Sequence, residues 1–206
     1  MLCALVFAKL FLSLIKGEIM KHYKGKLSTK KLVVLALFTA LAYIVSFLSF
    51  PIFPAAGFLK LDFGNVFIML AGFLFGPPEA IAVTLAKELL ALIGTETGGV
   101  GEIANFLMTS SFVILPSILY RFRKGINTVV LSLCGACVIG TVTAAIVNRF
   151  ITFPLYEEFI GPADAAFNFY FWYVIGFNIL KTVSISILTV LLYKRLSRFL
   201  TEFGAK

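Results

Sequence analysis

Residues 97–106 read TGGVGEIANF, a glycine-rich turn that runs directly into an apolar helix. Glycine leaves the backbone free to adopt unusual conformations and to come close to a guest molecule. The first N–H groups of a helix also lack partners within that helix. Glu102 and Asn105 follow about one helical turn apart. The stretch suggests a small-molecule site at the mouth of a membrane segment; the alternative is a tight extracellular turn with two polar residues among the headgroups.

The composition is that of an integral membrane protein. Apolar residues make up 60% of the 206 residues and charged residues only 14%, with a mean hydropathy of +1.01, whereas charged residues form about a quarter of a soluble domain. This length accommodates about six spanning helices of roughly 20 residues, which leaves no room for a soluble catalytic domain. The basic residues flank apolar runs, so the net charge of +8 indicates orientation in a bilayer instead of nucleic-acid binding.

Apolar runs and their end signals predict six helices, at about residues 31–50, 63–75, 79–93, 101–120, 126–150 and 172–193. Proline and glycine separate them, as at Gly76-Pro77. The fifth helix repeats small residues every four positions up to Asn148, a pattern typical of closely packed membrane helices: Ser132, Ala136, Gly140 and Ala144. Residues 151–171 contain prolines and acidic residues, and they are predicted to form an aromatic, acidic outer loop.

The basic residues predict the orientation. Of the 18 Lys and Arg residues, 14 lie in the N-terminal segment, after the fourth helix or in the C-terminal tail. With six helices these three regions share one side, and the positive-inside rule places that side, with both termini, in the cytoplasm. The predicted fold is therefore an all-α membrane protein with six transmembrane helices and both termini cytoplasmic.

The N-terminal segment precedes the predicted helices. Residues 1–30 are apolar and then basic, and they lack a small-residue cleavage site. They are interpreted as an interfacial or dispensable segment before a six-helix domain at 31–206.

A second segment outside the helices lies between the first and second helices. Residues 50–62, FPIFPAAGFLKLD, are too apolar for an ordinary loop and too interrupted by proline and glycine for a helix. They are predicted to form a structured flap over the outer face, between the first and second helices.

Polar residues gather in the predicted outer halves of the later helices. Besides Glu102 and Asn105, Asn148 ends the fifth helix, and Asn178 and Lys181 lie about one turn apart in the sixth. An amide both donates and accepts hydrogen bonds, which suits the amide and imide edge of a heterocycle, and a lysine adds a charged donor. The alternative for each residue is a hydrogen bond that ties two helices together.

Aromatic residues and the flap would complete such a pocket. Flat apolar walls are expected from Phe58, Phe63, Phe106 and Trp172. Leu59 and Asp62, at the end of the flap, join Phe58 in the predicted ligand site.

No motif for catalysis or ATP hydrolysis is present. The sequence lacks GxxxxGK[ST] and HExxH, and its sole histidine, His22, falls in the basic N-terminal segment. Cys134 and Cys137 have the spacing of a redox or metal pair, but they lie in an apolar helical run without a nearby histidine, so no metal or cofactor is predicted. Lys87 and Glu88 lie within the third helix, where a charge must face protein or water.

Five segments occur in an informative order: FLKLDFGNV, GFLFGPPEA, TGGVGEIANFL, NRFITFPLY and GFNILKT. Over about residues 32–194 this order resembles the riboflavin-specific S component of energy-coupling factor (ECF) transporters. The resemblance implies six helices, a flap, and a vitamin pocket open to the outside of a prokaryotic-type plasma membrane. It places Asn148 and Lys181 at the positions of a flavin-contacting amide and amine, and Glu102 and Asn105 in the family's GGVGE-x-AN turn.

The resemblance also implies partners. Ala36 and Ala40 look like the family's first-helix motif for docking onto a transmembrane coupling subunit, which works with two ATPase subunits. Riboflavin would then be a transported ligand and not a cofactor. Two alternatives remain: an S component for another vitamin, or a membrane-embedded enzyme. An enzyme would need a reactive cluster near the headgroups, for which only Lys87-Glu88 and Arg149 are available.

Overall fold

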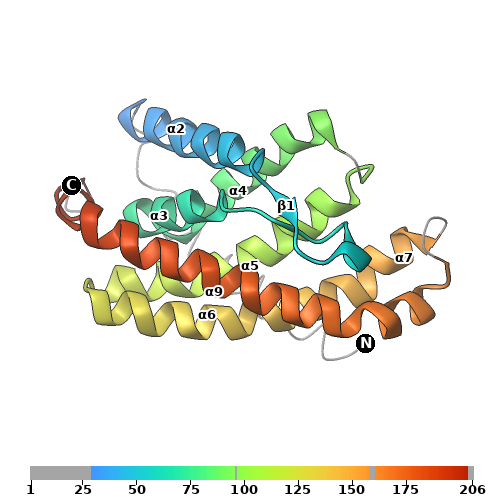
Figure 1. Cartoon of the computed structure of the whole chain (residues 1–206). Coiled ribbons are helices and arrows are strands. Elements are labelled where there is room, and N and C mark those ends of the chain that lie inside the picture. The colour runs from blue at the N-terminus through green and yellow to red at the C-terminus, as the bar shows by residue number, and fades with distance from the viewer. Residues whose placement is uncertain (1–28, 96, 158–160, 204–206) are drawn as a thin grey trace.

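The computed structural model describes residues 29–95, 97–157 and 161–203, which form a bundle of helices (Figure 1). The interpretation of residues 1–30 therefore lies almost wholly outside the described residues. The elements in chain order are α2 (Thr29–Ser46), β1 (Phe50–Pro51), a 3₁₀ turn (Pro54–Ala56), β2 (Lys60–Leu61), α3 (Asn65–Phe75), α4 (Pro77–Ala91), a 3₁₀ turn (Leu92–Gly94), α5 (Val100–Phe122), α6 (Ile126–Val147), a π-helix (Asn148–Thr152), α7 (Phe153–Leu155) and α9 (Ala163–Phe203).

The all-α class and the six main helices confirm the prediction, but the bounds of the first and sixth helices differ from it. The first helix ends at Ser46 and not at residue 50. The sixth begins at Ala163 and not at 172, and extends to Phe203, so most of the predicted outer loop at 151–171 is helical. Asp164 lies in the first turn of α9, where an acidic residue complements the positive end of the helix dipole. Asp164, one of the acidic residues that suggested a loop, is therefore a signal for the start of a helix.

The helices differ in length. Four are long and apolar enough to cross a membrane, with bounds Thr29–Ser46, Val100–Phe122, Ile126–Leu155 and Ala163–Arg195 among the described residues. The other two, α3 with 11 residues and α4 with 15, are shorter than a full crossing of roughly 20 residues. They meet at Gly76, whose φ of 108° is a conformation that favours glycine. The chain is a multi-pass membrane protein.

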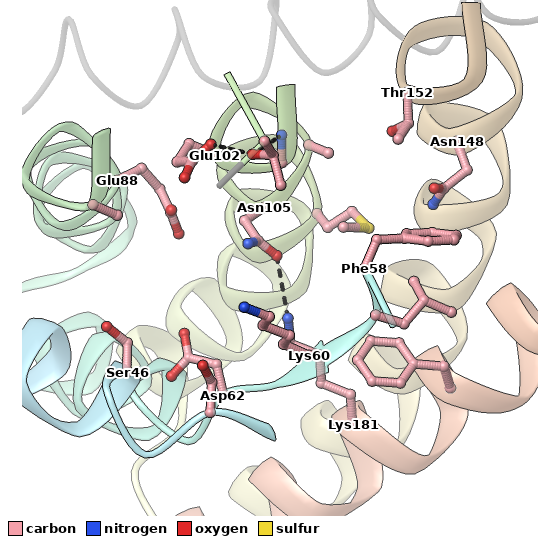
Figure 2. A pocket seen from close by; sticks show the side chains of 18 of the residues that line it. Ser46, Phe58, Lys60, Asp62, Glu88, Glu102, Asn105, Asn148, Thr152 and Lys181 are labelled. Carbon is pink, nitrogen blue, oxygen red and sulfur yellow. Dashed lines mark hydrogen bonds between the residues drawn. The ribbon is translucent and has the colours of Figure 1, made fainter. Parts of the chain in front are cut away.

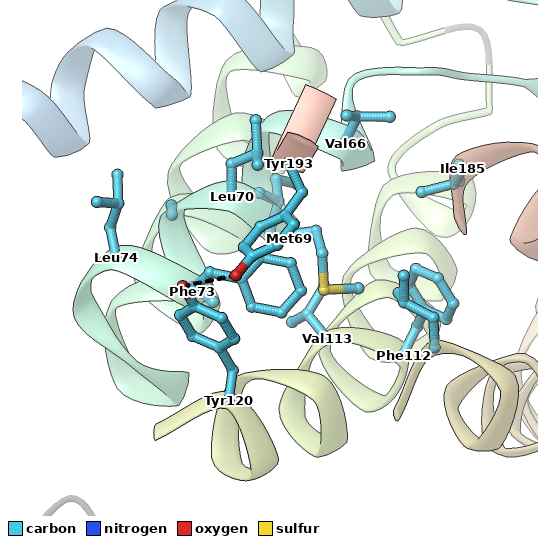
Figure 3. Packing of buried hydrophobic residues seen from close by; sticks show 14 of the residues in the cluster. Val66, Met69, Leu70, Phe73, Leu74, Phe112, Val113, Tyr120, Ile185 and Tyr193 are labelled. Carbon is cyan, nitrogen blue, oxygen red and sulfur yellow. Dashed lines mark hydrogen bonds between the residues drawn. The ribbon is translucent and has the colours of Figure 1, made fainter. Parts of the chain in front are cut away.

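The apolar core lies where α3, α5, α6 and α9 meet (Figure 3). Met69 and Phe73 of α3 pack there with Tyr120 of α5 and Tyr193 of α9, and the two tyrosine hydroxyls lie 3.3 Å apart. At the same end, Lys31 of α2 forms an ion pair with Glu79 of α4 and lies over the Phe75 ring. The described chain therefore begins and ends at one end of the bundle, as the count of helices requires.

The small residues of α6 form a buried seam, as predicted. Ser132, Ala136, Gly140 and Ala144 are all buried, and so is Asn148 at the end of the seam. A Cβ atom at Gly140 would lie only 3.2 Å from a Thr182 methyl group of α9 and 3.4 Å from the Phe112 ring of α5. Close packing of α6 against both neighbours thus fixes the position of Asn148.

The flap is ordered, as expected for residues 50–62. β1 and β2 pair antiparallel, with Phe50 opposite Leu61. Ala56, Leu59 and Leu61 are buried in a second apolar cluster that includes Phe153. Burial of these three residues therefore holds the flap against the end of the bundle formed by α7 and the first half of α9.

Candidate ligand-binding site

A cavity of about 640 Å³ lies at the end of the bundle that carries the flap. Its lining comes from the end of α2, the flap, α4, the start of α5, the π-helix and the middle of α9 (Figure 2). This volume is typical of pockets that enclose a small molecule, which range from about 300 to 1,000 Å³.

The structure brings the eight residues predicted to bind the ligand into this one lining. They are Phe58, Leu59, Asp62, Glu102, Asn105, Asn148, Asn178 and Lys181. They come from segments more than 100 residues apart in the chain, since Phe58 lies on the flap and Lys181 on α9. The convergence is structural; contact of each residue with a ligand stays a prediction.

The amides and the lysine connect the helices around the cavity. The Lys181 ammonium donates a hydrogen bond to Asn105 Oδ1 at 3.2 Å, which joins α9 to α5 (Figure 2). Asn148 and Asn178 each donate from Nδ2 to the backbone carbonyl four residues earlier, at 2.8 Å. An amide has two N–H groups and a carbonyl oxygen, so both asparagines keep donor and acceptor capacity for a ligand.

The glycine-rich turn places Glu102. Gly98 and Gly99 have φ values of 60° and 95°, a region that residues with a Cβ rarely adopt. The Thr97 hydroxyl donates to Glu102 Oε2 at 2.8 Å and accepts from the Gly101 N–H at 3.1 Å. The turn thus orders the first residues of α5 and holds the Glu102 carboxylate at the cavity.

A buried ion cluster forms the side of the cavity next to the flap. The Lys87 ammonium donates to Asp62 Oδ2 at 2.8 Å and to Glu88 Oε1 at 3.0 Å, and the exposed fractions of the Lys87, Asp62 and Glu88 side chains are 4%, 9% and 5%. Burial acts to raise the pKa of the Asp62 carboxyl, but the ammonium groups of Lys87 and Lys181 outweigh it and hold that pKa below its ordinary value. The cluster ties the flap to α4.

Lys87 and Glu88 were not predicted as site residues, although the sequence carried a signal for them. Two charges within an apolar helix must face protein or water, and here they face both a counter-charge and the cavity. Thr152 and Tyr156 also line the cavity. Their sequence context gave no comparable signal, because their positions depend on the π-helix.

The predicted aromatic walls are only partly correct. Phe58 lines the cavity, and its ring packs edge-on against Phe153 at a centroid distance of 6.2 Å. Phe63 and Phe106 are not part of the lining, and the Trp172 residue is 76% exposed. Phe106 follows Asn105 directly, and consecutive helical residues point about 100° apart. Trp172 lies well inside α9, on a face turned away from the cavity.

Ala36 and Ala40 lie apart from the cavity, as a docking role requires. Both are exposed on α2, where Ala42 is the only buried residue of the helix. They therefore do not pack into the interior of this chain.

Comparison with known proteins agrees with this architecture. The family model for the substrate-specific component of ECF transporters matches residues 30–193. The riboflavin transporter RibU of Staphylococcus aureus is 36% identical over 174 residues, which cover 83% of this chain and 92% of that protein. The riboflavin transporter FmnP of Bacillus subtilis is 27% identical over 183 residues, covering 85% and 96%.

A solved structure supports the same assignment. It is described as the S component of a bacterial ECF transporter, and it superposes with a TM-score of 0.70 and 34% sequence identity over 83% of this chain and 97% of that chain. The family is one of transporter components and not of enzymes. This chain belongs to the substrate-specific components of ECF transporters.

Proposed function

We propose that this chain is the high-affinity riboflavin-binding subunit of an ECF-type vitamin importer. It captures riboflavin from outside the cell in the cavity beneath the flap. The names of the relatives in Staphylococcus aureus and Bacillus subtilis support this ligand. The observation that carries the proposal is the cavity itself, in which amides, a lysine and aromatic rings from distant segments converge.

The lining suits a flat, polar-edged and uncharged ligand. Phe58, Phe153 and Phe177 supply aromatic surface, on which a fused ring system can pack. Asn148, Asn178 and Lys181 supply donors and acceptors for the polar edge of the ring. The charged lining residues balance, since three lysines (Lys60, Lys87, Lys181) accompany three acids (Asp62, Glu88, Glu102).

Release of riboflavin into the cell would depend on partners. The sequence contains no nucleotide-binding loop of the GxxxxGK[ST] type, so the energy for import has to come from other subunits. We propose that the exposed Ala36 and Ala40 face of α2 docks onto a transmembrane coupling subunit that carries two ATPases. Small residues four apart allow the close helix approach that drives association within lipid.

Riboflavin titration of the purified protein tests the pocket. We expect Asn148→Ala and Lys181→Ala each to weaken binding at least about tenfold, because polar ligand atoms would lose buried partners. Ile179→Ala is a matched control, since Ile179 lies on the same helix as Lys181 but is 49% exposed and outside the lining. Quenching of flavin fluorescence measures the riboflavin affinity of the unaltered protein and of the three variants.

Two results would count against the proposal. Equal affinity of both variants and the unaltered protein would mean that riboflavin does not use this pocket. Failure of the unaltered protein to bind riboflavin, with tight binding of another vitamin, would favour the alternative S component.

A further inference from the structure

One polar side chain that lines the cavity lacks a hydrogen-bond partner in the part of the chain that the structure describes. Six buried side-chain polar atoms have no hydrogen-bond partner among the described residues: Asn65 Oδ1, Glu79 Oε2, Ser110 Oγ, Thr143 Oγ1, Thr152 Oγ1 and Thr189 Oγ1. Of these, only Thr152 Oγ1 belongs to a residue that lines the cavity. Thr152 is only 4% exposed, so bulk water does not replace the missing bond. Buried hydroxyls are normally paired, and an exception calls for a specific cause.

The Thr152 hydroxyl lies in a π-helix, where the backbone hydrogen bond spans five residues instead of four. Three other threonine hydroxyls in the bundle, those of Thr84, Thr141 and Thr182, donate to the carbonyl four residues earlier, a common arrangement within helices. For Thr152 that carbonyl belongs to Asn148. In the π-helix it accepts instead from the Phe153 N–H, five residues along. The Thr152 hydroxyl makes no hydrogen bond to this carbonyl or to any other group among the described residues.

The same turn sets the hydroxyl beside a predicted ligand contact. Asn148 and Thr152 are the first and last residues of the π-helix, and both side chains lie at the cavity (Figure 2). Single π-turns occur frequently at functional sites. Here one short segment contributes both an asparagine and a threonine to the lining of the same cavity.

We propose that the Thr152 hydroxyl is a further ligand contact, which forms a hydrogen bond with a polar atom of the bound molecule. The inference rests on the proposed function, because the ligand it serves is the one held by Asn148 and Lys181. The hydroxyl both donates and accepts, so it fits a heterocycle nitrogen, a carbonyl or a sugar-alcohol hydroxyl. The π-helix then places two side chains that contact the ligand, Asn148 and Thr152, on one face.

Thr152→Val removes the hydroxyl while keeping a branched side chain of similar size, and Thr152→Ser keeps the hydroxyl. We expect Thr152→Val to weaken riboflavin binding about tenfold, as for the loss of a buried hydrogen bond, and Thr152→Ser to retain most of the affinity. Thr143→Val is the matched control. Its hydroxyl is also buried and unpartnered but lies outside the lining, so its affinity should stay within about twofold of the unaltered protein.

The melting temperature without ligand separates binding from folding. Because the hydroxyl has no partner within the described protein, Thr152→Val should melt no lower than the unaltered protein, while the rise in melting temperature caused by riboflavin should shrink. Thr152→Ala provides a second measurement if the valine disturbs the turn. Normal riboflavin affinity in both Thr152→Val and Thr152→Ala overturns the inference. Absence of riboflavin binding by the unaltered protein overturns the proposed function itself, so the two failures are distinguishable.

Discussion

Lys87 is the shared partner of the two carboxylates in the ion cluster beside the flap. Its ammonium serves both Asp62 and Glu88, and all three side chains are almost fully buried. Removing one partner of a buried ion pair leaves an uncompensated charge, which typically costs about 3–5 kcal/mol. Replacing the whole cluster with neutral groups avoids that cost.

We therefore expect Lys87→Met to lower the free energy of unfolding by about 3 kcal/mol, because two carboxylates lose their shared counter-charge. The triple variant Lys87→Met, Asp62→Asn, Glu88→Gln is the matched comparison, and it should recover much of the loss. Thermal unfolding in detergent measures the stability of the single and the triple variant. A single variant as stable as the unaltered protein, or a triple variant less stable than the single one, would contradict a stabilising cluster.

The sequence predicts site residues where a local pattern marks them, either along a helix or in the apolar flap. Asn148 was found because small residues every four positions lead to it along α6. Asn105 follows the glycine-rich turn, and Lys181 lies about one turn from Asn178 inside an apolar helix; the structure joins them by a hydrogen bond. Thr152 was not found, since its orientation depends on a π-helix that no spacing rule revealed. Trp172 was wrongly assigned to the pocket, because the sequence does not show which face of α9 packs against the bundle.

At the scale of elements, α2 packs more loosely than the other long helices. Ala42 is its one buried residue, and it lies against the turn before α3. A Cβ atom at Gly64 would lie 2.3 Å from the backbone oxygen of Ala42 and 3.0 Å from Asp62 Oδ1. Because a backbone atom cannot rotate away, any side chain at Gly64 must push α2 and α3 apart.

Gly64→Ala is therefore expected to destabilise the protein by about 1–3 kcal/mol, the usual range for overpacking. Gly57→Ala is the matched control on the flap, because a Cβ atom there meets nothing within 4 Å. Thermal melting in detergent distinguishes them, with a lower melting temperature for Gly64→Ala alone. Equal melting temperatures for the two variants would show that α2 moves to accommodate the added Cβ atom without a loss of stability.

Element boundaries were predictable where glycine and proline act locally, as at Gly76-Pro77 between α3 and α4. They were missed where local signals conflict. Residues 163–171 combine acidic and aromatic residues in a way that suggested a loop, but packing of that segment against the flap and α7, through Ala163, Ala166 and Phe153, favours helix. Tertiary burial thus overrides the local composition.

At the scale of the whole molecule, the proposed docking residues Ala36 and Ala40 lie outside the cavity, although the end of the same helix lines it through Tyr43 and Ser46. The cavity lies beneath the flap, while α2 presents a nearly continuous apolar surface. Val33, Leu37 and Ile44 are exposed there by 63%, 57% and 60%, beside the small residues Ala36 and Ala40. In lipid, such a face attracts another helix through close packing instead of through a hydrophobic effect.

The double variant Ala36→Trp, Ala40→Trp tests whether this face is a docking surface. Two bulky side chains one turn apart would fill the groove that a partner helix needs. Both positions are exposed and outside the cavity lining, so riboflavin affinity and melting temperature should stay close to those of the unaltered protein. Co-purification with the coupling subunit and ATPases, and uptake by cells, should be lost.

The control places the same bulk on another helix. Val138 and Val142 of α6 are also four residues apart and exposed by 65% and 52%, so Val138→Trp, Val142→Trp adds two tryptophans to a lipid-facing surface. This control should bind riboflavin, recover the partner complex and support uptake. If the α2 variant recovers the complex normally, the docking face lies elsewhere. If it instead loses stability and riboflavin affinity in isolation, Ala36 and Ala40 serve the packing of this chain and not a partner.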